Sequence, residues 1–183
     1  MASTQSPERE TDEPLAMRWS IGRVAAIITG LSIVIFWAWV FSGAPARTNP
    51  DRLADREYAA SLEDRCQQLR DDIRVLPNAV TLDDLDQRLD ILTQANGLVA
   101  IFIDDVEAGA PTTGDANKTV TGWIADWRTY LANREDYARR LQTDPDARLL
   151  LDLSPLGDSV DKTIEVFADV NMIEVCATPG DVG

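Results

Sequence analysis

Apolar residues along this chain follow two patterns, and the first is one unbroken run near the N-terminus. The run VAAIITGLSIVIFWAWVF, residues 24–41, holds 18 residues without a charge and has no polar face at helical period. At a rise of 1.5 Å per residue it spans about 27 Å, close to the hydrocarbon thickness of a bilayer. A buried core helix of a globular domain would show a polar stripe, which this run lacks. The pattern predicts one transmembrane helix, residues 18–42 with its flanks, that contacts the lipid bilayer through residues 24–41.

Basic residues beside the run predict its orientation. Within 15 positions of the run, three basic residues lie on each side: Arg9, Arg18 and Arg23 before it, and Arg47, Arg52 and Arg56 after it. Arg18 and Arg23 lie closest to the membrane, and positive charge there favours the cytoplasmic side. We therefore expect a disordered cytosolic tail over residues 1–17, a linker over 43–49 and an extracytoplasmic helical domain over 50–183, with the chain as a single-pass protein of the cell membrane. Ala44-Pro45-Ala46 matches a signal-peptidase site, so cleavage there is the alternative.

The second pattern is a series of stripes in which apolar residues recur every three or four positions. The first predicted helix has Asn49 as its N-cap and Pro50 at its first position, and it ends at Pro77-Asn78. Its apolar stripe is Leu62, Cys66, Leu69, Ile73 and Leu76. The second predicted helix opens at Thr81 and ends at Gly109, with a stripe of Leu82, Leu85, Leu89, Leu92, Asn96, Val99, Ile103 and Val106.

A third long helix and a shorter fourth complete the prediction. The third runs over about 115–143, with a wide apolar face of Val120, Trp123, Ile124, Trp127, Tyr130, Leu131, Arg134, Tyr137, Ala138 and Leu141. Alternating leucines in 145–158 indicate an extended segment over the core, and the fourth helix begins near Ser159. The residues after Cys176 are expected to leave the fold. The predicted fold class is all-α, an antiparallel helical bundle behind one transmembrane helix.

Charge and composition narrow the chemistry. The net charge is −14, and residues 47–183 alone hold 27 acidic and 14 basic side chains. Such a surface repels phosphate backbones, so nucleic acid is not an expected partner. The chain has no histidine, which removes Ser-His-Asp catalysis and imidazole metal ligands. Acid clusters such as Asp83-Asp84-Asp86 do not follow calcium-loop spacing, so we predict no catalytic residue, no metal ligand and no cofactor.

Cys66 and Cys176 are the only cysteines, one on the first domain helix and one after the last. A bundle whose end returns to its beginning would bring them together in an oxidising compartment. We predict a structural disulfide between them; two buried free thiols are the alternative.

The third helix carries the densest group of chemically active side chains: Trp123, Asp126, Trp127, Tyr130, Arg134 and Tyr137. Aromatic rings on one face, with Asp126 and Arg134 as polar contacts, form a candidate face for a ligand or partner. The competing interpretation places them in the core, with polar tips that reach solvent or an ion pair.

Several short segments together resemble a family of actinobacterial membrane-anchored helical proteins of unknown function. They are Cys66, the run from Trp123 to Tyr130, Arg134, Tyr137-Ala138, Asp144-Pro145, and Phe167-Ala168 through Asn171-Met172 to Cys176-Ala177. The resemblance spans about residues 50–183. It implies an exported bacterial domain and brings no activity with it.

Three functions fit these observations. The first is a non-enzymatic binding or scaffold domain, an accessory subunit of a membrane or cell-envelope complex, with other membrane or envelope proteins as partners. The second is a small-ligand sensor that uses the aromatic face of the third helix. The third is a carboxylate-based hydrolase of envelope polymers, which needs two acids roughly 5–10 Å apart across a cleft.

Overall fold

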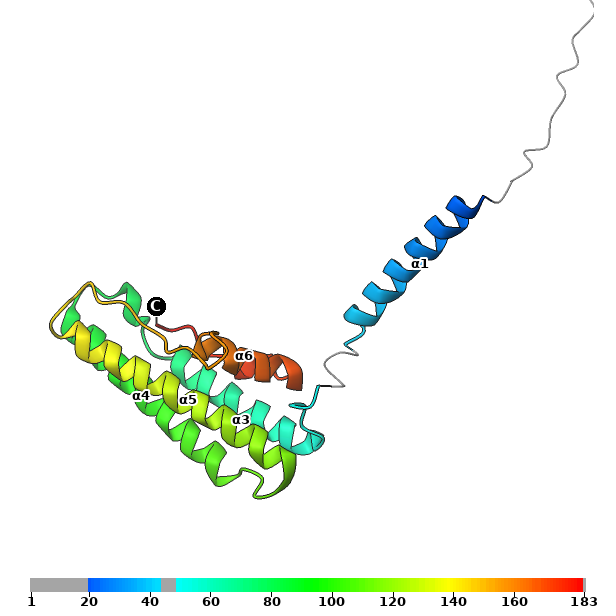
Figure 1. Ribbon diagram of the computed structural model, residues 1–183. Coiled ribbons are helices and arrows are strands. Elements are labelled where there is room, and N and C mark those ends of the chain that lie inside the picture. The colour runs from blue at the N-terminus through cyan, green and yellow to red at the C-terminus, as the bar shows by residue number, and fades with distance from the viewer. Residues whose placement is uncertain (1–19, 44–48, 183) are drawn as a thin grey trace, which may run out of the picture. The chain divides into compact units, whose positions relative to one another are not determined.

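The computed structural model describes residues 20–43 and 49–182, and within them the chain is all-helical, as predicted (Figure 1). It divides into two compact units, one up to Gly43 and one from Ala44 onward. The predicted tail over 1–17, Arg18 and the Ala44-Pro45-Ala46 segment lie outside the described residues.

Helix α1 (Ile21–Phe41) forms the first unit. Its N-cap Ser20 accepts the backbone N–H of Arg23 at 3.3 Å, and none of its residues is buried. The rings of Trp37 and Phe41 stack at one end, with centroids 5.5 Å apart. Of the helices in the described residues, it is the one long and apolar enough to cross a membrane.

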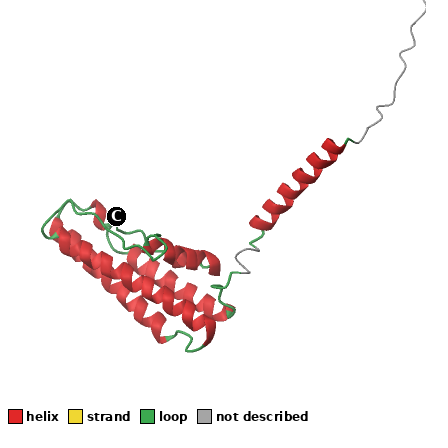
Figure 2. Cartoon of the chain, viewed as in Figure 1, coloured by secondary structure: helices red, strands yellow, loops and turns green. Residues whose placement is uncertain are grey.

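Over residues 49–182 the second unit has four α-helices and two short 3₁₀ helices. Their bounds are α3 (Arg56–Arg74), η1 (Ala79–Thr81), α4 (Leu85–Ala108), α5 (Gly114–Leu141), α6 (Val160–Asn171) and η2 (Glu174–Cys176). Helix α4 packs against both α3 and α5, and α6 packs against α5 and η2. Figures 1 and 2 show α3, α4 and α5 side by side, with α6 beside one end of them.

The predicted stripes form the core. Along α4 the buried residues include Leu92, Asn96, Val99 and Val106, all from the expected stripe. Aromatic rings fill the centre: Phe102 meets Trp127 edge-on with centroids 5.0 Å apart. The apolar face of α5 is therefore mostly interior, where it contributes most to stability.

Two helices begin later than the sequence predicts. Asn49 does cap a turn, because its side chain accepts the N–H of Asp51 at 2.8 Å, but α3 begins at Arg56. Asp55 is the true N-cap and accepts the N–H of Tyr58 at 2.9 Å. Similarly α4 opens after Asp84, whose carboxylate accepts the N–H of Gln87 at 2.9 Å. An aspartate close to each first apolar turn outcompetes the earlier capping signal.

The segment after Cys176 stays on the fold, which corrects the prediction that it leaves. Arg70 donates to the backbone carbonyls of Val175 at 2.7 Å and Ala177 at 3.2 Å. Further along, the side chain of Val182 is buried. We call residues 177–182 the strap. The strap carries Asp181, whose carboxylate pairs with the buried guanidinium of Arg134.

Residues 145–158 form a non-helical cover, as expected. Leu149 and Leu151 are half-buried against the core, whereas Leu153 is 68% exposed. Leu153 pairs with Ser159 in an isolated antiparallel bridge, which closes a small hairpin, residues 153–159.

Candidate functional site

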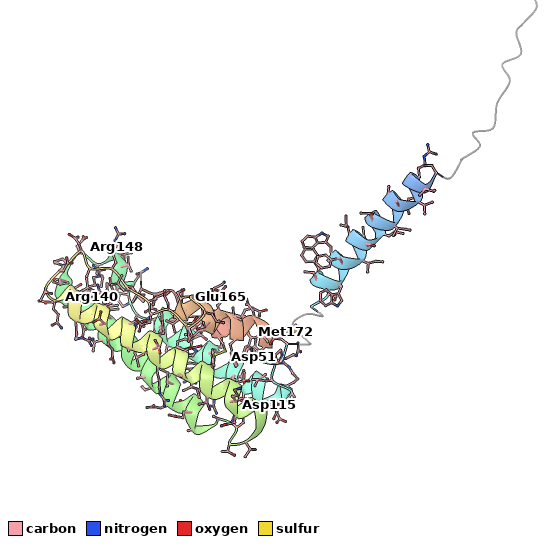
Figure 3. All side chains as sticks on the ribbon, viewed as in Figure 1. Asp51, Asp115, Arg140, Arg148, Glu165 and Met172 are labelled. Atoms are coloured by element: carbon pink, nitrogen blue, oxygen red, sulfur yellow. A yellow bond between two sulfur atoms is a disulfide. The ribbon has the colours of Figure 1, made fainter. Side chains whose placement is uncertain are left out.

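A hollow of about 790 Å³ lies where the first half of α5, helix α6 and the 153–159 hairpin meet. We call it the α5–α6 groove. Its volume falls within the range of ligand sites, roughly 300–1,000 Å³. Asp51 and Asp115 are among its lining residues, and Figure 3 shows both at one end of the domain, away from Arg140 and Arg148.

Two stacked rings line the groove from the core side. Trp123 on α5 and Phe167 on α6 lie nearly parallel, with ring centroids 4.5 Å apart. The indole N–H of Trp123 is buried and has no hydrogen-bond partner in the structure. A buried donor without a partner is unfavourable by roughly 1–3 kcal/mol, so this N–H is a polar group open to pairing.

The hairpin forms one rim of the groove. The N–H of Gly157 donates to the carbonyl of Ser154 at 2.9 Å, and Gly157 has φ of +93°, a conformation that glycine adopts without strain. This tight turn presents Leu156 at its tip, 91% exposed. The turn therefore adds an exposed apolar side chain to the rim of the groove.

The charges around the groove are mixed, with acids in excess. Its two cationic side chains, Lys118 and Lys162, are the only lysines of the chain, and Lys162 already pairs with Glu165 at 2.8 Å. The acidic side chains that line the groove are Asp51, Asp115, Asp126 and Asp158. The rim therefore favours a ligand with positive charge.

Hydrogen bonding to Glu165 raises the pKa of Lys162, and the second side chain of the groove with a shifted pKa is Asp126. Its carboxyl is half-buried between α5 and α6, and this burial raises its pKa above the usual aspartate range. A hydrogen bond with the Thr163 side chain offsets part of that rise.

Five of the six residues of the predicted ligand face, all except Asp126, are buried. Trp123 and Asp126 line the α5–α6 groove. Trp127, Tyr130, Arg134 and Tyr137 are buried in the interior. Tyr137 still finds a polar partner, because the guanidinium of Arg88 donates to its hydroxyl. Helical periodicity places all six residues on one face of α5. The packing of α6 against α5 determines which of them line the groove.

Arg134 is the polar centre of the interior. Its side chain is 0% exposed, and it donates from Nη1 and Nη2 to the two oxygens of Asp181 at 2.6 and 2.7 Å. Nε donates to Asn96 at 2.7 Å. Burial alone would lower the pKa of Arg134, but the bonds to Asp181 outweigh it and the net shift is upward. The sequence holds no periodic signal for Asp181, so sequence reasoning missed it.

Cys66 and Cys176 form a disulfide that joins α3 to η2, with Cα atoms 5.0 Å apart. Both residues are buried, and the link closes a loop of 110 positions. Within the described residues, no three His, Cys, Asp or Glu side chains gather closely enough to hold a metal ion.

The described residues define a class: a helical domain with a half-open groove, preceded by one apolar helix of membrane-spanning length. Comparisons with protein-family models, with curated proteins and with solved structures found no match to this chain. The geometry of the groove therefore carries the functional conclusion.

Proposed function

We propose that this protein is a membrane-anchored binding domain that holds a segment of another membrane or envelope protein in the α5–α6 groove. It would serve as an accessory subunit of a membrane complex. The observation that carries the proposal is the groove itself, a cavity of about 790 Å³ beside a tight turn that exposes Leu156. This surface offers apolar contact and polar groups together.

The chemistry of the groove indicates its occupant. Apolar side chains such as Leu156 and Val166 favour an apolar face, and four aspartates against two lysines favour positive charge. An amphipathic partner segment with leucine-like and lysine-like residues meets both demands. An anionic lipid surface does not, because Asp152 and Asp158 flank the exposed tip and repel acidic head groups.

The membrane setting belongs to the same proposal. Helix α1 is long and apolar enough to act as a single-pass anchor, and Arg18 and Arg23 favour a cytoplasmic N-terminus with the domain outside. The resemblance to actinobacterial anchored proteins supports a bacterial envelope as the place of action. The disulfide also fits an oxidising compartment.

A peptide-binding measurement tests the groove. The probe is a synthetic amphipathic peptide of leucine and lysine, added to the full chain in detergent, with a leucine–glutamate peptide of equal length as the comparison. We expect the lysine peptide to bind more tightly, and Leu156→Ser to weaken it several-fold. Leu150→Ser is the matched control, since Leu150 is 64% exposed and does not line the groove.

Added salt should weaken the binding of the lysine peptide, because salt screens the attraction between its lysines and the acidic rim. Equal binding of the two peptides, or equal loss in the Leu150 and Leu156 variants, would rule the groove out as a site for a basic apolar segment.

A second function, small-ligand binding, is favoured by two unpartnered polar groups beside the same groove. The hydroxyl of Ser154 and the indole N–H of Trp123 are both buried without a hydrogen bond. Native mass spectrometry of the full chain purified from its host membrane distinguishes the two functions. A retained small molecule, lost in Ser154→Val, would support the ligand; a retained polypeptide, lost in Leu156→Ser, would support the partner segment.

A further inference from the structure

The buried side chain of Arg134 is held in an orientation that binds a carboxylate. Its guanidinium is fully buried, and Asn96 of α4 fixes its orientation by accepting from Nε at 2.7 Å. The remaining fork faces the strap, where Asp181 fills it with two bonds of 2.6 and 2.7 Å. Two parallel N–H···O bonds are the strongest geometry for an arginine and a carboxylate.

The carboxylate that Arg134 binds is that of Asp181 in the strap, and the strap is held mainly at its first residues. The disulfide at Cys176 and the bonds from Arg70 to the carbonyls of Val175 and Ala177 secure the root of the strap. Gly180 then turns the backbone with φ of +68°, and Asp181 and Val182 dock beyond it. A short segment with few buried apolar groups belongs to the low-stability end of a structure.

A cavity of about 220 Å³ lies beside the docked carboxylate. Pro179 and Asp181 of the strap line it, together with the apolar side chains of Ile73, Leu76, Ile91 and Leu92 and the polar side chains of Arg74 and Asn78. The volume corresponds to roughly seven water-sized groups. The strap therefore borders a space that it does not fill.

We infer that Arg134 and this cavity form a binding site for a short aliphatic monocarboxylate, and that Asp181 is its internal competitor. An incoming carboxylate that replaces Asp181 keeps the charge and the two hydrogen bonds on Arg134 unchanged. Its aliphatic body gains contact with Leu76 and Ile91, which line the cavity and are only half-buried. The replacement of Asp181 by the added carboxylate breaks only the contacts that dock the strap. It does not involve the α5–α6 groove.

Removal of the competitor tests the site. The full chain in detergent carries Asp181→Ala, and thermal unfolding is followed with sodium butyrate or sodium acetate against sodium chloride at equal ionic strength. We expect butyrate to raise the Tm of Asp181→Ala saturably and more than acetate does, because butyrate also fills the cavity. Wild type should respond less, since Asp181 occupies the fork.

Asp136→Ala is the matched control, because Asp136 pairs with Arg140 on the surface at 2.7 Å rather than in the interior. A butyrate effect equal in the Asp136 and Asp181 variants would overturn the inference, as would one no larger than that of chloride.

A second measurement covers the case in which Asp181→Ala does not fold. Amide hydrogen exchange of the strap is followed in wild type with and without butyrate. Faster exchange at residues 180–182 alone, with the helices unchanged, supports displacement of Asp181. Unchanged or slower exchange at saturating butyrate contradicts it.

Discussion

The side-chain oxygen of Asn171 accepts the backbone N–H of Leu53 at 2.8 Å, although 118 positions separate the two residues. Its amide nitrogen donates to the carbonyl of Phe167 at 3.0 Å and to that of Asp51 at 3.4 Å. Asn171 is fully buried at the end of α6, and Leu53 precedes α3. The Asn171 side chain thus joins the segment before α3 to the end of α6, at the end of the domain where Figure 3 shows Asp51 and Met172 together.

Asn171→Ala should destabilise the domain by about 1–3 kcal/mol, because it leaves the buried N–H of Leu53 without a partner. Chemical denaturation measures the loss. Thr93→Ala is the control, since the Thr93 hydroxyl bonds only within its own exposed helix turn, and it should change stability by less than about 0.5 kcal/mol. Equal losses in the two variants would contradict the role of Asn171.

Removal of the disulfide through Cys66→Ala and Cys176→Ala together should lower stability by about 2–5 kcal/mol, since the link constrains a loop of 110 positions in the unfolded chain. Thermal unfolding of the double variant measures the effect. Wild type taken from the membrane should resist alkylation after denaturation without reductant. Ready labelling at both cysteines would contradict a disulfide in the cell and weaken the extracytoplasmic placement.

Asp126→Asn should raise stability at neutral pH. Burial raises the pKa of Asp126 in the folded state, so the charged carboxylate is unfavourable there, and the folded protein gains stability from this group as pH falls through that pKa. The asparagine variant removes the charge and should lose this pH dependence. Unfolding at neutral and at acid pH, with both proteins, measures the difference.

Asp136→Asn is the control of opposite sign. Hydrogen bonding to Arg140 lowers the pKa of Asp136, so its contribution is present at neutral pH and is lost as pH falls through its folded-state value. The Asp136 variant should be slightly less stable than wild type at neutral pH. Changes of the same sign in the two variants would refute the assigned environments.

Gly97→Ala should stabilise the domain by about 0.5–1 kcal/mol, because Gly97 lies in the interior of α4 and a β-carbon there would meet nothing within 4 Å. Denaturant midpoints of the purified chain measure the gain. A loss of stability would show that something packs closely on this face of α4.

Alkaline phosphatase fused after Gly183 should be active in a bacterial host, because the enzyme folds only when exported and the basic residues near the span favour an outside domain. Exchange of Arg18 and Arg23 for glutamate, combined with lysines introduced into the linker over 43–49, should reduce that activity. A silent phosphatase in the unchanged chain, with an active cytosolic reporter at the same point, would reverse the orientation.

The periodicity of apolar residues and the local capping residues determined which segments form helices and which faces of those helices are buried. The length and apolar character of residues 24–41 predict a helix of membrane-spanning length, and α1 is such a helix. The stripes of α3 and α4 predict most of their buried residues, because a helix must bury its apolar face whichever neighbour covers it. Helix starts were less predictable, since both Asn49 and Asp55 can cap a helix, and the structure uses Asp55, which lies nearer the first apolar turn of α3.

Only the tertiary structure decided what the polar residues do. Trp123 and Arg134 lie on one helical face, yet the packing of α6 brings the first to a groove and the strap covers the second. Asp181 comes from a segment without periodicity, so its bond to Arg134 depends on a chain reversal that no local pattern encodes. Side-chain period is a property of one helix, whereas a site requires the positions of several elements at once.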